Sequence, residues 1–288
     1  MSLNRRHLMQ LSAAATAALA VGRDQVAAAP ASREPIGKAA AVYLGKHGYA
    51  ELPPRDLITG QDFNGGLLFD AIRPDAPKDL RYCIQTVARV GDIANRDRSG
   101  VLAAYNVILI QHPAPPQRGT LLMRVMDFFV NVRALDPAKM QFLSTDVFVP
   151  HLEKVKGAGA KQFTQVSAAE ARSAGRGAGV FAPKDHPSGF DFATVNVYYP
   201  AGAGPVGHPT PAAPEGHLEI ALIGIGPTGG KLAGAEVAGI GVERLGLAEG
   251  AAAPSFEQSR IALLRALEAE AKSKGKPLPP GYRAFASL

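Results

Sequence analysis

The sequence predicts an α+β protein, a single domain dominated by an antiparallel β-sheet with helices packed against it. Segments rich in aliphatic and aromatic residues recur along the chain and are bounded by turn-forming residues, which is typical of strands. The connections that can be recognised between them are short, as between antiparallel neighbours. Strands and helices do not alternate as they do around a parallel sheet, and an amphipathic pattern near the C-terminus predicts a helix there.

The N-terminal half of the domain is expected to hold one helix followed by strands. The helix is expected in residues 37–48, GKAAAVYLGKHG, which begin and end with glycine. Residues 95–100, NRDRSG, are typical of a tight hairpin turn. The four expected strands are LLFDAI (67–72), RYCIQTVARVGDI (81–93), VLAAYNVILIQ (101–111) and TLLMRVMDFFVNVRAL (120–135).

The middle of the chain is expected to return to helix and then to strand. Ser167 and Glu170 have the spacing of a capping box, in which each side chain bonds an unpaired amide near the start of a helix. A short helix is therefore expected to begin there. Two further strands are expected in FDFATVNVYY (190–199) and HLEIALIGIG (217–226).

Residues 255–275 form the clearest helix in the sequence. Ser255 and Gln258 have capping-box spacing, and Gly275 supplies a C-terminal stop. We expect the pairs Glu268–Lys272 and Glu270–Lys274 to support the exposed side. The apolar stripe, which we expect to pack on the sheet, consists of Phe256, Leu263, Leu264, Leu267 and Ala271.

The charge pattern excludes nucleic acid as an expected partner. The formal net charge is +6 at pH 7; residues 1–31 contribute +2 of it, from three arginines less one aspartate, so the remainder carries +4. These basic residues are scattered over a large domain. A nucleic-acid groove instead shows a basic stripe with aromatic residues between the charges.

Residues 1–31 have the organisation of an export signal. Arg5 and Arg6 precede a run of 16 residues without formal charge, which ends before Arg23. The run is shorter than the about 20 apolar residues of a transmembrane helix, and small residues suited to cleavage follow it. We therefore expect a signal peptide at 1–31, a mature domain at 32–288, and no transmembrane span in the mature protein.

The stretch Asn4-Arg5-Arg6-His7-Leu8-Met9-Gln10 resembles the twin-arginine signal family, with Gln10 where that family commonly has lysine. The resemblance implies recognition by the export machinery, passage of a folded protein across the bacterial inner membrane, and a periplasmic or secreted location. An ordinary signal for unfolded export and a retained N-terminal anchor are the alternatives. Cys83 is the only cysteine, so no internal disulfide can form, in agreement with folding in a reducing compartment. We expect it to be a buried strand residue.

A glycine motif follows the last strong strand. Residues 224–229, GIGPTG, match G-x-G-x-x-G, and Glu243 lies 19 residues beyond Gly224, near where a ribose-binding acid is found in dinucleotide-binding proteins. The motif must open a helix for that role, whereas Pro227 and the glycines after it favour a loop. We interpret the motif as a flexible glycine-rich loop.

A histidine and a carboxylate share one face of a predicted strand. Alternation places His217 and Glu219 on the same side, and His208 lies in the preceding loop as a third candidate ligand. Such a set could hold zinc or another divalent metal with an open position for water. The alternative is that these polar residues lie on the solvent face of an amphipathic strand. Further donors from an adjoining loop would be Asp185, His186 and Asp191.

Four other residues have ionisable side chains to which the sequence assigns no definite function. His112 and His151 each adjoin a proline at an element boundary and are expected to be surface loop residues. Arg124 and Asp127 interrupt an apolar segment that we expect to be a strand, and alternation then places them on opposite faces. They are expected either at a sheet edge or in the lining of a cavity.

Three functions follow from these observations. The first is an exported bacterial protein that binds a small, partly apolar ligand in a β-walled cavity. The second is a metal-assisted hydrolase or lyase that uses His208, His217 and Glu219. The third is an accessory subunit of an exported redox complex, which fits the twin-arginine route but has no residue signal of its own.

Overall fold

The computed structural model describes residues 34–59, 62–63, 79–113, 115–145, 149–167, 180–181, 192–201, 216–226 and 234–288. The chain divides into two units, Met1–Pro35 and Ile36–Leu288, and all elements below belong to the second. Several sequence predictions lie outside the described residues. These are the export signal, the strand LLFDAI, the helix after Ser167, the end of the glycine motif from Pro227, and the candidate ligands Asp185, His186, Asp191 and His208.

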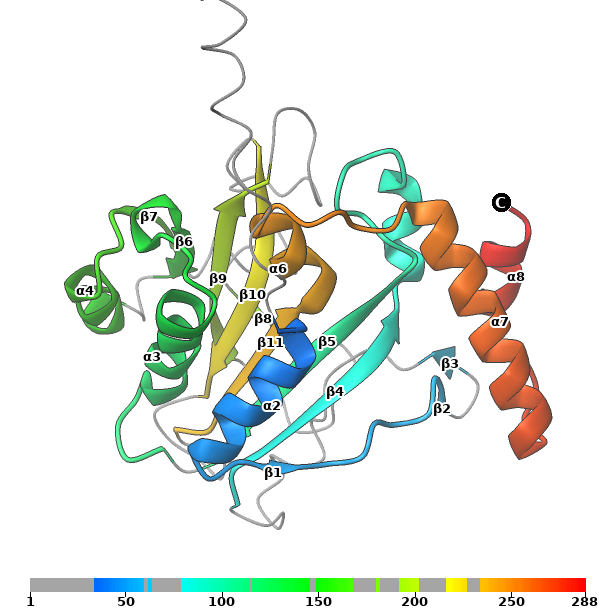
Figure 1. Ribbon diagram of the computed structural model, residues 1–288, viewed down its shortest axis with the longest axis horizontal. Coiled ribbons are helices and arrows are strands. Elements are labelled where there is room, and N and C mark those ends of the chain that lie inside the picture. The colour runs from blue at the N-terminus through cyan, green and yellow to red at the C-terminus, as the bar shows by residue number, and fades with distance from the viewer. Residues whose placement is uncertain are drawn as a thin grey trace, which may run out of the picture. The chain divides into compact units, whose positions relative to one another are not determined.

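The α+β prediction is confirmed (Figure 1). The described strands form a nine-stranded sheet of order β1-β4-β5-β11-β10-β9-β6-β7, with β8 paired to β9, and a separate pair of β2 with β3. Within the large sheet, β1 pairs with β4 and β6 with β7 in parallel, and the other pairs are antiparallel. The strands are β1 (Ala50–Glu51), β2 (Ile58–Thr59), β3 (Asp62–Phe63), β4 (Arg81–Ala88), β5 (Ala104–His112), β6 (Gln141–Thr145), β7 (Gln162–Val166), β8 (Val180–Phe181), β9 (Phe192–Pro200), β10 (His217–Ile225) and β11 (Glu236–Gly241).

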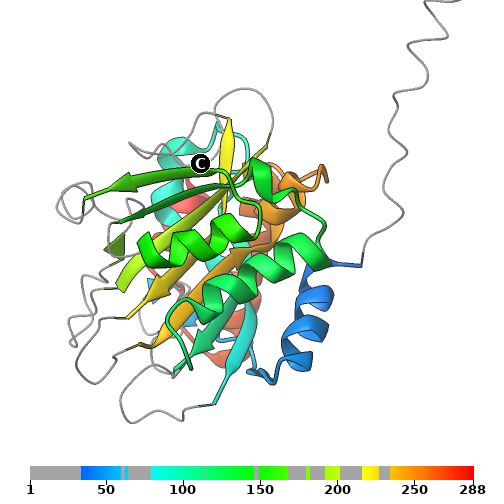
Figure 2. The same cartoon turned by 90° about the vertical axis from the view of Figure 1, so that its left-hand side faces the viewer.

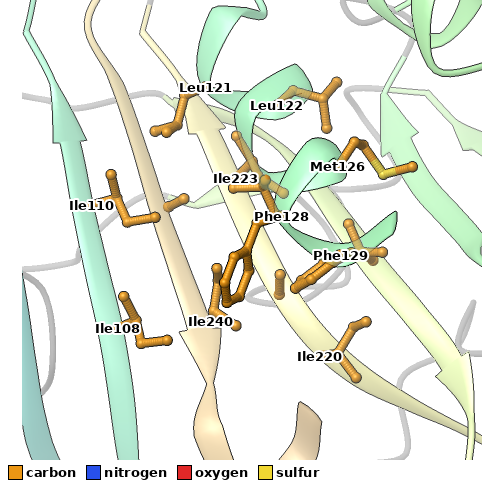
Figure 3. Close-up of a cluster of buried hydrophobic side chains, with 14 of the residues drawn as sticks. Ile108, Ile110, Leu121, Leu122, Met126, Phe128, Phe129, Ile220, Ile223 and Ile240 are labelled. Carbon is orange, nitrogen blue, oxygen red and sulfur yellow. The ribbon is translucent and has the colours of Figure 1, made fainter. Parts of the chain in front are cut away.

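Helices cover one face of the large sheet. In Figure 2, α3 and α4 lie across this face, in front of the central strands. Apolar side chains of the helices meet those of the strands here, and Figure 3 shows Phe128 and Phe129 beside Ile220 and Ile240 in the middle of this core. The helices are α2 (Ile36–Lys46), α3 (Thr120–Asp127), α4 (Val149–Gly157), α6 (Val242–Ala248), α7 (Phe256–Lys274) and α8 (Gly281–Ala286), with η2 (Val90–Asn95), η3 (Phe128–Val132) and η4 (Pro137–Lys139) as shorter turns.

The segment 120–135, which the sequence predicts as a strand, is helical. It forms α3 and then one π-helical turn, η3. Its buried residues recur three and four positions apart, which is the period of one helix face, and a short apolar run does not distinguish the two structures by composition. The start of the helix is fixed from elsewhere, because Glu236 of β11 accepts the amide protons of Gly119 and Leu121.

This correction changes the place of two charged residues. Arg124 and Asp127 were expected on opposite faces of a strand, but on α3 they are three residues apart and lie on the same side. Both contact Tyr43 of α2, whose hydroxyl donates to the carbonyl oxygen of Arg124 at 3.1 Å and to the Asp127 carboxylate. They therefore join two helices.

The β4–β5 connection is also longer than the tight hairpin that the sequence predicts. β4 ends at Ala88, and the 3₁₀ helix η2 precedes the turn residues. The segment leaves the sheet because Asp92 of η2 is buried and accepts hydrogen bonds from Arg89 and Tyr105. Cys83 is fully buried on β4, as expected, and burial raises the pKa of its thiol to about 11.

The C-terminal helix agrees closely with its prediction. Ser255 and Gln258 form both hydrogen bonds of the capping box, and Gly275 adopts the left-handed conformation, with φ of 62°. Phe256, Leu263 and Leu267 pack with residues at the β4–β5 end of the sheet. Among the described helices, none combines the length and the hydrophobicity that crossing a membrane requires.

The polar partners of α7 differ from the two pairs that were expected within the helix. Glu270 accepts the amide protons of Leu57 and Ile58 at 2.8 and 3.0 Å, and Lys274 pairs with Asp56. These contacts attach the start of β2 and the two residues before it to the helix. Intrahelical spacing alone did not reveal them, because the partners are more than two hundred residues away in sequence.

Candidate ligand-binding face of the sheet

The two faces of the large sheet differ in chemistry. The face under the helices is mainly apolar, whereas strand alternation places a series of polar side chains on the other, which we call the polar face. Buried polar groups are costly unless they form hydrogen bonds, so a buried polar surface of this kind needs partners. The polar face carries Gln85 of β4, Tyr105 and Gln111 of β5, Thr194 and Asn196 of β9, and Glu219 of β10, and all except Glu219 are buried.

Glycines occupy the middle of the polar face. The strand register places Gly239 opposite Leu222 and Gly224 opposite Val237, so no side chain projects from either glycine. Packing does not require glycine at position 239, because an added Cβ would meet Val107 and Leu109 at 3.6 and 3.7 Å, which is ordinary contact. Glycine inside a strand often marks close approach by a ligand or another backbone.

Gly241 has a different role, since it lies against the side chain of Arg244. An added Cβ would come within 3.4 Å of the Arg244 Cβ and Cδ atoms. Gly241 is the last residue of β11 and precedes α6, in which Arg244 is the third residue. The strand therefore ends with a small residue that leaves room for the arginine chain to lie along it.

Arg244 lies at the edge of the polar face with its side chain only 13% exposed. Its Nη2 atom donates to the Tyr105 hydroxyl at 2.9 Å, and its Cζ atom lies 4.4 Å from the centroid of the Tyr105 ring. Nη1 is 3.7 Å from Glu219 Oε2, beyond ordinary hydrogen-bond length. The Nε atom is buried and has no hydrogen-bond partner within the described part of the chain.

Tyr105 connects Arg244 to a buried carboxylate. The tyrosine hydroxyl donates to Asp92 Oδ2 at 3.0 Å and accepts from Arg244 and from the amide of Leu102 at 3.1 Å. One donor and two acceptor sites are thus all used. Burial raises the pKa of Tyr105, so the hydroxyl keeps its proton. Arg89 donates to the second oxygen of Asp92 at 3.3 Å.

Residues of the neighbouring strand β9 position the Glu219 side chain. Asn196 donates its amide Nδ2 to Glu219 Oε1 at 2.8 Å, and the Thr194 hydroxyl contacts Asn196 Oδ1 at 3.3 Å. The β9–β10 register shifts between Glu219 and Ala221, which marks a β-bulge. Bulges redirect side chains next to functional sites, and this one lies at the carboxylate that faces Arg244.

The structure places two of the three candidate metal ligands. His217 and Glu219 lie on β10 with the alternation that the sequence predicts, and His208 lies outside the described residues. Glu219 faces Asn196 and Arg244. Over the part of the chain that the structure describes, no three histidine, cysteine or acidic side chains are close enough to hold a metal ion. The metal site therefore stays a prediction.

Sequence reasoning missed the residues at the centre of this arrangement. Arg244, Tyr105 and Asp92 come from α6, β5 and η2, and only the tertiary fold brings them together. The available signal was Gly239-Ile240-Gly241, an alternation of glycine just before the charged pair Glu243-Arg244. Glu243 accepts from the amide and the side chain of Asn106, so it fastens α6 to β5.

Comparison with known proteins finds no family model that matches and no matching curated protein. Among solved structures, apo histidyl-tRNA synthetase from S. aureus is similar over 81% of this chain and 75% of its own, with 12% identity and a TM-score of 0.43. Aspartyl-tRNA synthetase from Entamoeba histolytica matches 78% of this chain and 56% of its own, at 12% identity and a TM-score of 0.42.

A third similar structure is asparaginyl-tRNA synthetase from Entamoeba histolytica, with 13% identity and a TM-score of 0.38 over 75% of this chain. The alignment covers 63% of that synthetase, and the match to the aspartyl enzyme likewise spans less than two thirds of its length. Because all three TM-scores are below 0.5, the likeness assigns no function to the chain.

Proposed function

We propose that this protein is exported by a bacterium and binds a small, partly apolar ligand on the polar face of its sheet. The observation that supports the binding site most directly is Arg244. Its guanidinium is stacked on Tyr105, its Nε donor is buried, and that donor has no partner among the described residues. The side chain is 13% exposed, so a ligand acceptor can reach the guanidinium and form a charge-assisted hydrogen bond with it.

The surroundings of Arg244 define the chemistry of the ligand. Gly239, Leu222 and Val107 provide an apolar strip without projecting polar groups. At its edges, Arg244 offers hydrogen-bond donors and Glu219 offers an acceptor, with 3.7 Å between Nη1 and Oε2. A ligand with an apolar body, one acceptor and one donor fits this arrangement, since a few polar groups on an apolar surface fix orientation.

A ligand screen with matched variants tests the binding proposal. A compound that binds the native state raises the melting temperature by mass action. Purified protein lacking residues 1–31 would be screened against small metabolites, and each compound that shifts the melting temperature would be retested with Arg244→Gln. A shift lost in that variant and kept in Arg265→Gln, an exposed change on α7, supports the proposal. Shifts that are equal in both variants would locate the site elsewhere.

The export proposal has its own support and its own test. It rests on the resemblance of Asn4-Arg5-Arg6-His7-Leu8-Met9-Gln10 to twin-arginine signals. In a bacterial host, fractionation should recover the wild-type protein outside the cytoplasm, whereas a variant with Arg5→Lys and Arg6→Lys should stay inside. An equal distribution of the two proteins would contradict the twin-arginine route without bearing on ligand binding.

The metal-assisted alternative is favoured by one observation, the common face of His217 and Glu219 on β10. Metal analysis of the purified full-length domain decides it. Stoichiometric zinc or another divalent metal that is lost in His217→Ala would support this function over simple ligand binding. If the purified protein holds no metal, either before or after incubation with zinc, the metal-assisted function is excluded.

A further inference from the structure

A second polar cluster lies on the helix-covered face, separate from the proposed ligand site. It joins the end of α2 and the turn after it to α3 and to the end of β5. His112 was expected in a surface loop, but it is buried at the end of β5, with 7% of its surface exposed. The members of this cluster, which we call the α2 clasp, are Tyr43, His47, Tyr49, His112, Arg124 and Asp127.

The contact between His47 and Arg124 fixes the state of the histidine. Arg124 Nη1 lies 3.1 Å from His47 Nε2. A guanidinium donates hydrogen bonds and cannot accept them, so Nε2 must be the unprotonated acceptor. The imidazole is therefore neutral in this arrangement, and its ring packs edge-on against Tyr43, with 4.6 Å between centroids. Adding a proton to Nε2 would place two donors and two positive charges against each other.

The second histidine depends on the same arginine. Tyr49, which is also buried, places its hydroxyl 3.3 Å from His112 Nδ1. Burial raises the pKa of Tyr49 against the opposing charge of Arg124, so the hydroxyl keeps a proton that is available for Nδ1. One guanidinium thus acts on two histidines. Burial first, and the charge of Arg124 second, lower the pKa of both His47 and His112.

The other charged groups around the clasp partly oppose this effect. Asp127 favours the charged form of His47, and Lys46 of α2 disfavours it. The Asp127 carboxylate is already used, because it accepts from Tyr43 and from Asn131 at 2.6 Å. Glu236, beside His112 in the strand register, accepts the amide protons at the start of α3. Both carboxylates therefore have other hydrogen-bond partners while the histidines are neutral.

We propose that the α2 clasp is an acid-sensitive switch that releases α2 from α3 and the sheet when both histidines gain protons. Release must overcome the burial of Ala39, Ala40, Tyr43 and Leu44 in the core, and a pocket lined by Ala40, Tyr43, Leu44 and Arg124, with room for about one water molecule, gives solvent a place to enter beneath the helix. α2 is the first helix of its unit, and its departure breaks no strand pairing of the central sheet. Release would uncover the apolar ends of Ile108 and Ile110.

Hydrogen–deuterium exchange of the mature protein tests this switch. After correction for intrinsic exchange, protection of residues 36–46 should fall about tenfold or more between about pH 7.5 and about pH 5, while α7 keeps its protection. His47→Gln keeps an acceptor for Arg124 that does not titrate, so most of the loss should disappear. His217→Gln, on the opposite face of the sheet, should behave like wild type.

Three outcomes would overturn the switch: unchanged protection of α2, an equal loss of protection in α2 and α7, or an equal loss in His47→Gln and wild type. A second measurement does not depend on any variant. Titration of the imidazole resonances of the wild-type protein should give both His47 and His112 a pKa below the ordinary value of about 6.5. An ordinary or raised pKa at either residue would contradict the arrangement described above.

Discussion

Arg244 lies against the ring of Tyr105, with its Cζ atom 4.4 Å from the ring centroid, while its Nη2 atom donates to the hydroxyl of the same residue. The Tyr105 hydroxyl in turn donates a hydrogen bond to Asp92. A single aromatic residue thus fixes a cation at the edge of the polar face and satisfies a carboxylate within the core.

The Tyr105 hydroxyl should therefore be important for stability. Tyr105→Phe keeps the ring but leaves Asp92 and the Arg244 Nη2 donor short of a partner, and we expect a loss of about 1–3 kcal/mol in the free energy of unfolding. Urea denaturation measures it. Tyr282→Phe, on α8, removes an exposed hydroxyl and is the matched control, with an expected cost below about 0.5 kcal/mol. Equal losses of stability would show that the buried hydrogen bonds of the Tyr105 hydroxyl contribute no more than the exposed hydrogen bond of Tyr282.

Substitution of Gly239 by alanine should affect ligand affinity more strongly than the free energy of unfolding. Because an added Cβ makes only ordinary contacts, Gly239→Ala should change the free energy of unfolding by no more than about 1 kcal/mol. The same methyl group would project into the polar face and should weaken the ligand by about tenfold or more. Calorimetric titration compares the two proteins. A variant that binds as tightly as wild type would exclude close approach of the ligand to β11.

The capping box of α7 should be worth about 1 kcal/mol. Ser255→Ala removes the acceptor for the Gln258 amide, so the free energy of unfolding should fall by that amount. Ser273→Ala, in the last turn of the same helix, is the control and should change stability little. A null effect of Ser255→Ala in urea denaturation would mean that packing alone starts the helix.

Acid should destabilise the protein through His112. Its pKa is lowered in the folded state, mainly by burial, so above the unfolded value of about 6.5 the histidine is neutral in both states. As the pH falls below that value, the unfolded state binds a proton that the folded state resists, and stability falls. Urea denaturation between about pH 7.5 and about pH 5 should show the decline, and His112→Gln should flatten it. A decline of the same slope in the variant would assign it to other groups.

Cys83 should be unreactive in the folded protein. It is fully buried, and its thiol pKa is raised to about 11, so the thiolate that reacts with alkylating agents is scarce. Iodoacetamide at about pH 8 should leave the native protein unmodified and label it in denaturant. Rapid labelling without denaturant would show that β4 opens locally.

Local patterns in the sequence predicted the parts of the fold that depend on neighbours along the chain. α7 was predicted with its cap, its stripe and its stop, because Ser255, Gln258 and Gly275 act within a turn of the backbone. α3 was predicted as a strand, because a short apolar run is compatible with either structure and its N-terminal cap, Glu236, comes from a distant strand.

The polar face could not be predicted in the same way. Its main residues are contributed by η2, β5, β9, β10 and α6, and only strand pairing together with helix packing brings them together. Alternation did place His217 and Glu219 on one side of β10, but it gave no indication that Arg244 would face Glu219. Pairing between distant segments is the information that a single sequence lacks.

The most direct test of the proposed function is the affinity of the strongest screened ligand for wild type, Arg244→Gln and Arg265→Gln, measured by isothermal titration calorimetry. Loss of a charge-assisted hydrogen bond should weaken binding to Arg244→Gln by about tenfold or more, whereas the exposed Arg265→Gln should bind like wild type. Equal affinity for all three proteins would contradict ligand binding at the polar face.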